Sequence, residues 1–260
     1  MRFIHAISPT TLEKGVNWDE NFALLQEIGI SDILCPDFFT FKYVYDQLKR
    51  KEIFGSIYVV SPPKKESIKM IWDLLCSFEV FTLFISFRAK FKDYSAYRDA
   101  LYEAFSLTDE VGCLIEADLV PQEDELIETI QRDFGVRQFL VEDPKGLFLP
   151  EDTTNTIRLL KRKIVEGSDV FFYPKDTYSL GLINSLVAMA EEIDGLIGSL
   201  FRAEDTNSVD FIRLSSVYKY KKKMLFSPHL VETLDKAFFP LCNLGNRITF
   251  PKKGKDKPLR

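Results

Sequence analysis

The sequence predicts an α/β fold, a single-domain (β/α)8 TIM barrel, from three observations. Eight short apolar runs recur along the chain without the strict alternation of a half-exposed strand, as in a parallel sheet buried on both faces. Segments with apolar residues at three- and four-residue spacing, typical of helices, separate these runs. No Gly-x-Gly-x-x-Gly follows any run, so the rival fold, a doubly wound open sheet, has little support.

The eight apolar runs are the predicted strands. They occupy residues 3–8, 32–36, 55–61, 81–86, 112–117, 138–143, 170–174 and 195–200. Cys35 and Cys113 lie inside two of these runs, where a single cysteine usually acts as a small buried hydrophobe. Because the cysteines show no paired spacing, we expect neither a disulfide nor a zinc site, and we expect a cytoplasmic protein.

The segments between the runs predict helices, and three of them carry clear boundary signals. "WDENFALLQEIG" (18–29) and "QEDELIETIQRDFG" (122–135) both end in a glycine stop. "PEDTTNTIRLLKRKIVEG" (150–167) starts with proline, has acidic residues in its first turn and also closes with glycine, as the helix dipole favours. No segment is composed like a linker, so we assign residues 1–220 to one barrel. Residues 221–260 are expected to form an extension packed on it, with a basic, disordered tail.

Composition argues against two classes of partner. The formal net charge of −5 does not favour nucleic acid. The chain starts without an apolar signal segment and no run approaches roughly 18 consecutive apolar residues, so membrane insertion is not expected. The basic stretches at 219–223 and 251–260 are expected to be a solvated helix face and a terminus.

In such a barrel the chemistry lies in the loops after the carboxyl ends of the strands. The charged residues expected at this mouth are Glu13, Lys14, Arg88, Glu116, Asp118, Glu142, Asp143, Lys145, Lys175, Asp176, Arg202, Glu204 and Asp205. His5 is expected inside the first strand and His229 beyond the last unit, so a histidine-based metal site is not expected.

Two lysines of this set, Lys14 and Lys175, allow two interpretations. A lysine that is desolvated, or that lies beside another cation, can form a Schiff base with a carbonyl substrate. Alternatively, each lysine pairs with a neighbouring acid such as Asp176 or Asp205. Binding of an anion by lysine and arginine lies between the two.

Four segments resemble the family of HMG-CoA lyase, isopropylmalate synthase and homocitrate synthase, which are TIM barrels of the pyruvate carboxyltransferase type. They are "SPTTLEKG" (8–15), "DPKGLFLPEDTTNTIRLLK" (143–161), "LGLINSLVAMAEEIDGLIGSL" (180–200) and "FRAEDTNSVDFI" (201–212), of which the third carries the most weight. The resemblance spans most of the chain. It implies a metal-dependent barrel that makes or breaks a C–C bond next to a carbonyl.

The resemblance also implies where the family's metal ligands fall, and all four have changed. The aspartate falls on Lys14, the two histidines on Tyr173 and Lys175, and the asparagine on Asp205, while the arginine before the aspartate falls on Glu13. Because an ammonium group cannot ligate a divalent cation, we predict no metal and no other cofactor.

Other positions fit the family unevenly. Asp143 matches its strand-six aspartate, whereas Leu34 stands where the family often has glutamate. The assignment of the two histidine positions requires that Ser179 replaces a glycine five residues before Asn184.

The first functional hypothesis is a diverged enzyme that forms or cleaves a C–C bond without a metal, on a small anion such as a 2-oxo acid or an acyl-CoA-like compound. The predicted catalytic residues are Lys175, Lys14, Glu13 and Asp143, and the predicted substrate-binding residues are Arg202, Arg88, Tyr173 and Asp205. Lysine would bind the anion or attack the carbonyl, and the acids would transfer protons.

The alternative is a non-catalytic pseudoenzyme, a binding or scaffold protein. In it, Lys14–Asp205 and Lys175–Glu13 ion pairs would fill the vacated metal site. An aldolase unrelated to this family is a third, weaker interpretation, against which the segment at 180–200 argues. A homodimer stays open, because members of the family often dimerise.

Overall fold

The computed structural model describes residues 1–7, 18–48, 55–88, 94–122, 124–200 and 207–247, and these form a closed barrel of eight parallel strands. The strands are β1 (Arg2–Ala6), β2 (Asp32–Cys35), β3 (Ile57–Ser61), β4 (Phe81–Phe87), β5 (Val111–Glu116), β6 (Gln138–Asp143), β7 (Asp169–Pro174) and β8 (Gly195–Gly198). Their order in the sheet follows the sequence, and β8 closes the barrel by pairing with β1. The predicted (β/α)8 barrel is therefore confirmed.

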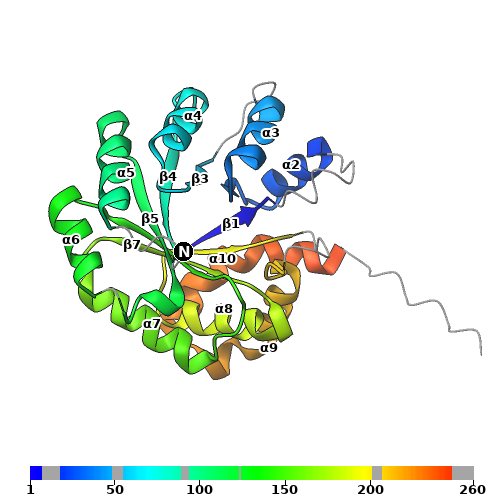
Figure 1. Ribbon diagram of the computed structural model, residues 1–260. Helices are drawn as coiled ribbons and strands as arrows, with labels where there is room; N and C mark the ends of the chain where they lie inside the picture. Colours follow the sequence, from blue (N-terminus) through cyan, green and yellow to red (C-terminus); the bar gives the residue numbers. More distant parts are fainter. Residues whose placement is uncertain (8–17, 49–54, 89–93, 123, 201–206, 248–260) are drawn as a thin grey trace, which may run out of the picture.

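Helices cover the outside of the strands (Figure 1). They are α2 (Trp18–Glu27), α3 (Phe38–Leu48), α4 (Lys65–Leu75), α5 (Tyr94–Leu107), α6 (Asp124–Phe134), α7 (Pro150–Lys163), α8 (Leu180–Ala190) and α9 (Phe211–Leu225). Single 3-10 turns follow β5 and β7, at Ala117–Leu119 and Thr177–Ser179. Within the described ranges, no helix is both long and apolar enough to cross a membrane.

Side-chain alternation along each strand separates the barrel interior from the layer under the helices. Tyr58, Phe84 and Phe171 belong to the inner apolar cluster, where the ring of Tyr58 lies 6.0 Å from that of Phe84 and 5.6 Å from that of Phe171. Residues two positions further along a strand face the same side. The inner rows therefore end at the C-terminal mouth in polar residues, such as Glu142 two positions after Leu140 and Lys175 four after Phe171.

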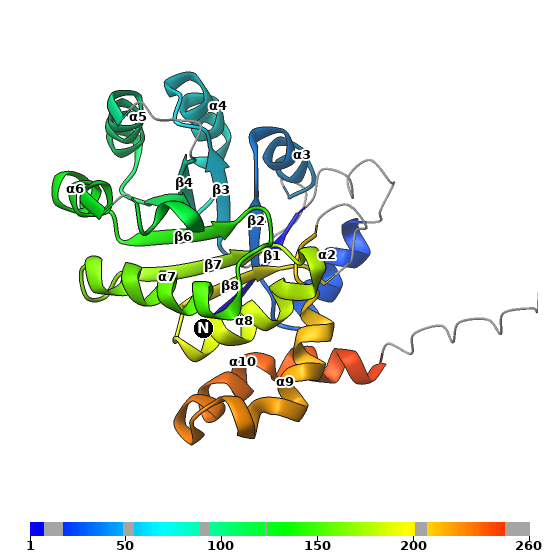
Figure 2. The same ribbon diagram turned by 60° about the horizontal axis from the view of Figure 1, so that its bottom comes forward.

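Helix α10 (Pro228–Arg247) lies against α9 and the start of β1 (Figure 2). The Phe238 ring stacks on Tyr218 of α9 at 4.3 Å and meets Phe3 of β1 edge-on at 4.7 Å. The predicted boundary at residue 220 falls inside α9, which continues to Leu225. The expected basic, disordered tail at 251–260 lies outside the described residues.

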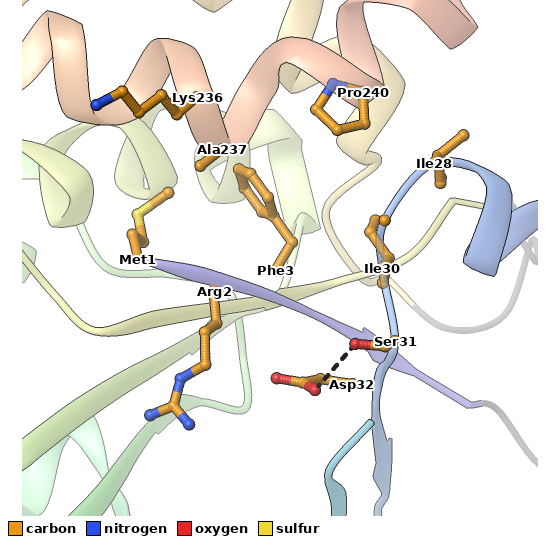
Figure 3. A pocket seen from close by; sticks show the side chains of 11 residues that line it. Met1, Arg2, Phe3, Ile28, Ile30, Ser31, Asp32, Lys236, Ala237 and Pro240 are labelled. Atoms are coloured by element: carbon orange, nitrogen blue, oxygen red, sulfur yellow. Dashed lines mark hydrogen bonds between the residues drawn. The ribbon is translucent and has the colours of Figure 1, made fainter. Parts of the chain in front are cut away.

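A cavity of about 230 Å³ lies between α10 and the N-terminal ends of β1 and β2. Figure 3 shows Phe3 pointing toward α10, whereas Arg2 points to the other side of β1. Arg2 donates to the Tyr58 hydroxyl at 3.0 Å and to Asp169 at 2.7 Å. Because this is the barrel end opposite the βα loops, the cavity belongs to the structural face of the fold.

Candidate site at the barrel mouth

The structure describes half of the predicted site. Glu13, Lys14, Arg202 and Asp205 lie outside the described residues, and so do the predicted Lys14–Asp205 and Lys175–Glu13 ion pairs. Arg88, Asp143, Tyr173 and Lys175 are described, on the loops and strand ends of β4, β6 and β7.

Arg88 and Lys175 meet on one carboxylate, that of Glu142 at the end of β6. The Arg88 Nη2 donates to Glu142 Oε2 at 3.1 Å, and the Lys175 Nζ lies 3.8 Å from the other oxygen, Oε1. The Glu142 side chain is only 6% exposed. Such a buried carboxylate is costly without charge compensation, and two cations supply it, one directly after β4 and one directly after β7.

Strand register explains why these residues come together. Glu142 lies opposite Glu116 of β5 on one side and opposite Tyr173 of β7 on the other. Arg88 follows β4 directly, and its Nε lies 4.0 Å from Glu116 Oε1. Both glutamates were expected at the mouth, but Glu142 was not among the predicted catalytic or substrate-binding residues. The strand alternation could have indicated Glu142, because it lies two positions after the inward-facing Leu140 and so faces the same side.

The surroundings of Lys175 stabilise a positive charge. Its Nζ lies 3.6 Å from the centroid of the Tyr173 ring, and the Tyr173 hydroxyl is 3.3 Å from Ser208 Oγ. The expected pairing of Lys175 with an acid is found, but the acid is Glu142. Asp176 instead lies 3.8 Å from Arg213 Nη1, so its suggested pairing with Lys175 is wrong.

Two glycines fix the backbone of Lys175. A Cβ at Gly146 would lie 2.7 Å from the Lys175 carbonyl oxygen, and one at Gly181 would lie 2.6 Å from it. A residue with a side chain at either position would clash with the Lys175 carbonyl oxygen. Tyr178 and Ser179 follow with φ of 58° and 62°. Ser179 thus adopts a conformation that favours glycine, consistent with its alignment to a glycine of the resembled family.

Asp143 organises the loop between β6 and α7. Its Oδ1 accepts from the backbone N–H groups of Gly146 (2.9 Å) and Leu147 (3.4 Å), and its Oδ2 accepts from Phe148 (3.1 Å). Asn184 of α8 holds the same loop by donating to the Phe148 carbonyl. Asp143 is buried. It lies two positions after Val141 on β6, so its side chain faces the layer under the helices and not the barrel interior. The geometry supports a structural role rather than the predicted proton transfer.

The described positions that align with the metal ligands of the resembled family do not fit a divalent cation. At one position the Lys175 ammonium offers no lone pair and is paired with Glu142. At the other, the Tyr173 ring lies under that ammonium. Leu34, where the family often has glutamate, belongs to the inner apolar cluster. No cluster of three or more His, Cys, Asp or Glu side chains suited to a metal is found in the described ranges.

His5 is an interior residue, as predicted. Its side chain is buried, and Nδ1 accepts from the Leu200 backbone N–H at 3.4 Å. Burial lowers the pKa of His5 to about 4, so the imidazole is neutral near neutral pH. Cys35 and Cys113 are also buried free thiols, as expected, and burial raises the pKa of Cys113 to about 12.

Comparison with known proteins supports the fold and adds one local relative. No family model matches the chain. Over 94 residues it is 32% identical to a 4-hydroxy-2-oxovalerate aldolase from Geobacillus stearothermophilus, a match that covers 35% of this chain and 27% of that protein. The chain thus matches only about a quarter of the length of this curated relative.

Solved structures of low sequence identity share the whole barrel. The N-terminal domain of a candidate aldolase from Bacteroides vulgatus has a TM-score of 0.68 at 14% identity, covering 95% of this chain and 88% of that one. The carboxyl transferase domain of Rhizobium etli pyruvate carboxylase has a TM-score of 0.60 at 10% identity (93% and 47% covered). HMG-CoA lyase from Brucella melitensis has a TM-score of 0.57 at 13% identity (94% and 98% covered). The resemblance to this group is confirmed at the level of the fold.

Proposed function

We propose that the protein is an aldolase- or lyase-type barrel that binds a small 2-oxo acid at its mouth and makes or breaks a C–C bond without a divalent metal. The observation that carries the proposal is the Arg88–Glu142–Lys175 network, at the end of the barrel where this fold places chemistry. The shared fold with aldolases and HMG-CoA lyase, and the local likeness to a 2-oxo acid aldolase, support the class of reaction.

The network suggests a role for each side chain. Arg88 binds the substrate carboxylate, and the Lys175 ammonium lies against the 2-oxo group, where a family enzyme would use its metal. In the cleavage direction a base, for which Glu142 is the described candidate, takes the proton of the 4-hydroxyl group. The C3–C4 bond then breaks, and its electron pair passes into an enolate whose oxygen Lys175 stabilises. The same acid returns the proton to C3, so that pyruvate and an aldehyde leave.

This mechanism differs from Schiff-base chemistry. Formation of a Schiff base requires the Lys175 nitrogen to attack the carbonyl carbon, whereas this nitrogen is paired with Glu142 and lies over the Tyr173 ring. We therefore expect no borohydride-trapped adduct of pyruvate on Lys175. A trapped adduct would show a covalent mechanism in place of the electrostatic one.

The direct test is cleavage of 4-hydroxy-2-oxopentanoate by the full chain in the presence of EDTA, followed through pyruvate release. We expect turnover in the native protein and a loss of about 100-fold or more in kcat for Lys175→Met, because an oxyanion would lose its stabilising charge. Lys145→Met is the matched control, since Lys145 is an exposed lysine in the adjacent loop. Equal rates for Lys175→Met and the native protein would contradict the proposal.

A second candidate function, a non-catalytic binding protein, is favoured by one observation. Glu142 already pairs with both Arg88 and Lys175. In that case a panel of 2-oxo acids and 3-hydroxyacyl-CoA compounds would give no turnover, while Lys175→Met would still lower stability. The remaining expectations, a homodimer and a cytoplasmic location without nucleic-acid or membrane partners, stay predictions.

A further inference from the structure

Two buried donors on the inner face of β4 have no hydrogen-bond acceptor among the described residues. Ser86 is 4% exposed, and its hydroxyl makes no hydrogen bond. The Nε of Arg88, two residues further on, is also buried and has no hydrogen-bond acceptor among the described residues, because its ion-pair partner, Glu116 Oε1, is 4.0 Å away. Both positions continue the inner row of Phe84.

Such unpaired groups call for an explanation, since almost all buried polar atoms in proteins have a partner. Thr40 and Thr153 also have an unpaired hydroxyl, but they lie on helices α3 and α7, outside the barrel interior. Ser86 and Arg88 differ because they lie in the inner row that leads from β4 to the mouth, where Arg88 is bonded to Glu142.

We propose that the Ser86 hydroxyl and the Arg88 Nε–H bind the substrate carboxylate, one donor to each oxygen, and so form a carboxylate subsite on β4. The inference rests on the proposed function in placing an anionic substrate at the mouth. It adds Ser86, which the resemblance did not indicate, and it leaves the Arg88 Nη2 bonded to Glu142. A hydroxyl and a guanidinium together suit a carboxylate better than a neutral group.

The same geometry narrows the substrate to acids whose carbonyl is adjacent to the carboxylate. Arg88 and Lys175 contact the two oxygens of a single carboxylate, so the two cations are close together. A carboxylate held by Arg88 therefore brings its own C2 group near Lys175. A 2-oxo monocarboxylate places its carbonyl there, whereas a 4- or 5-oxo acid does not.

The experiment is calorimetric titration of the full chain with sodium pyruvate and, separately, with pyruvamide, its neutral analogue. We expect pyruvate to bind at least tenfold more tightly than pyruvamide. Ser86→Ala should weaken pyruvate binding about tenfold or more, since a hydrogen bond to a charged group is lost, and should leave pyruvamide binding unchanged. Ser86→Cys, which keeps the volume but is a weak donor, should behave similarly.

Ser61→Ala is the matched control. Ser61 ends the neighbouring strand β3, is buried, faces outward with Val59, and already donates to the Pro62 carbonyl at 3.0 Å. It should bind pyruvate as the native protein does. Native-like pyruvate binding by folded Ser86→Ala, or equal binding of pyruvate and pyruvamide, would overturn the subsite.

The experiments distinguish failure of the proposed cleavage reaction from failure of the proposed carboxylate subsite. If Ser86→Ala loses pyruvate binding while the native protein cleaves no 4-hydroxy-2-oxo acid, the subsite holds and the proposed chemistry is wrong. If the native protein cleaves that substrate and Ser86→Ala keeps its KM, the chemistry holds and the subsite is wrong.

Discussion

His5 illustrates how one buried side chain makes stability depend on pH. It lies in the outward row of β1 and is neutral, because burial lowers its pKa to about 4 from an ordinary 6.5. The unfolded chain binds a proton on this imidazole below pH 6.5, whereas the folded chain does so only below about pH 4. The neutral, buried imidazole therefore contributes fully to the stability of the fold above pH 6.5, and this contribution is lost as the pH falls from 6.5 to about 4.

We expect the native protein to lose about 3 kcal/mol more unfolding free energy between pH 7 and pH 4 than the variant His5→Asn, which retains an acceptor for the Leu200 N–H. Urea unfolding at a series of pH values measures this. His229→Asn, at an exposed position of α10, is the control and should follow the native curve. Parallel curves for the native protein and His5→Asn would show that His5 is not the group responsible.

At the scale of single elements, the loops after β6 and β7 form one unit around Lys175. The Asp143 carboxylate caps three backbone N–H groups of the first loop, and Asn184 ties that loop to α8. Gly181 and Gly146 leave space for the Lys175 carbonyl. The position of the lysine thus depends on backbone contacts that the residue itself does not make.

Asp143→Asn should therefore lower the unfolding free energy by about 2–3 kcal/mol, because the amide cannot accept on both of its polar atoms and its NH2 meets backbone donors. Urea unfolding checks the change, with Asp118→Asn, an exposed acid after β5, as the control. A variant that stays as stable as the native protein but loses turnover would instead support the proton-transfer role predicted from the sequence.

These elements also show what the sequence could and could not predict. The eight strands were predictable because a strand of a parallel barrel is apolar on both faces, as in β4 and β7, and is bounded by helix signals. The partner of Lys175 was not predicted. It depends on the register of β6 against β7, and Asp176 was the nearer acid in sequence. The position of Ser86 at the carboxyl end of a predicted strand was visible in the sequence, but its lack of a hydrogen-bond partner among the described residues was not.

At the scale of the whole molecule, the barrel carries its polar groups at opposite ends with different roles. The N-terminal end, with Arg2 between Tyr58 and Asp169 and with α10 beside it, is occupied by contacts that hold the fold together. The C-terminal end gathers Arg88, Glu142 and Lys175, and there Ser86 Oγ and Arg88 Nε have no hydrogen-bond acceptor within the described part of the chain. We propose that these cations, in place of a metal, bind a 2-oxo acid.

The most direct measurement is titration of the full chain with sodium pyruvate after dialysis against EDTA, repeated after addition of MnCl2. Because the two described positions aligned with the family's metal ligands hold the Lys175 ammonium and the Tyr173 ring under it, we expect binding in EDTA, with a Kd that Mn²⁺ leaves unchanged. Binding that appears only when Mn²⁺ is added would contradict it.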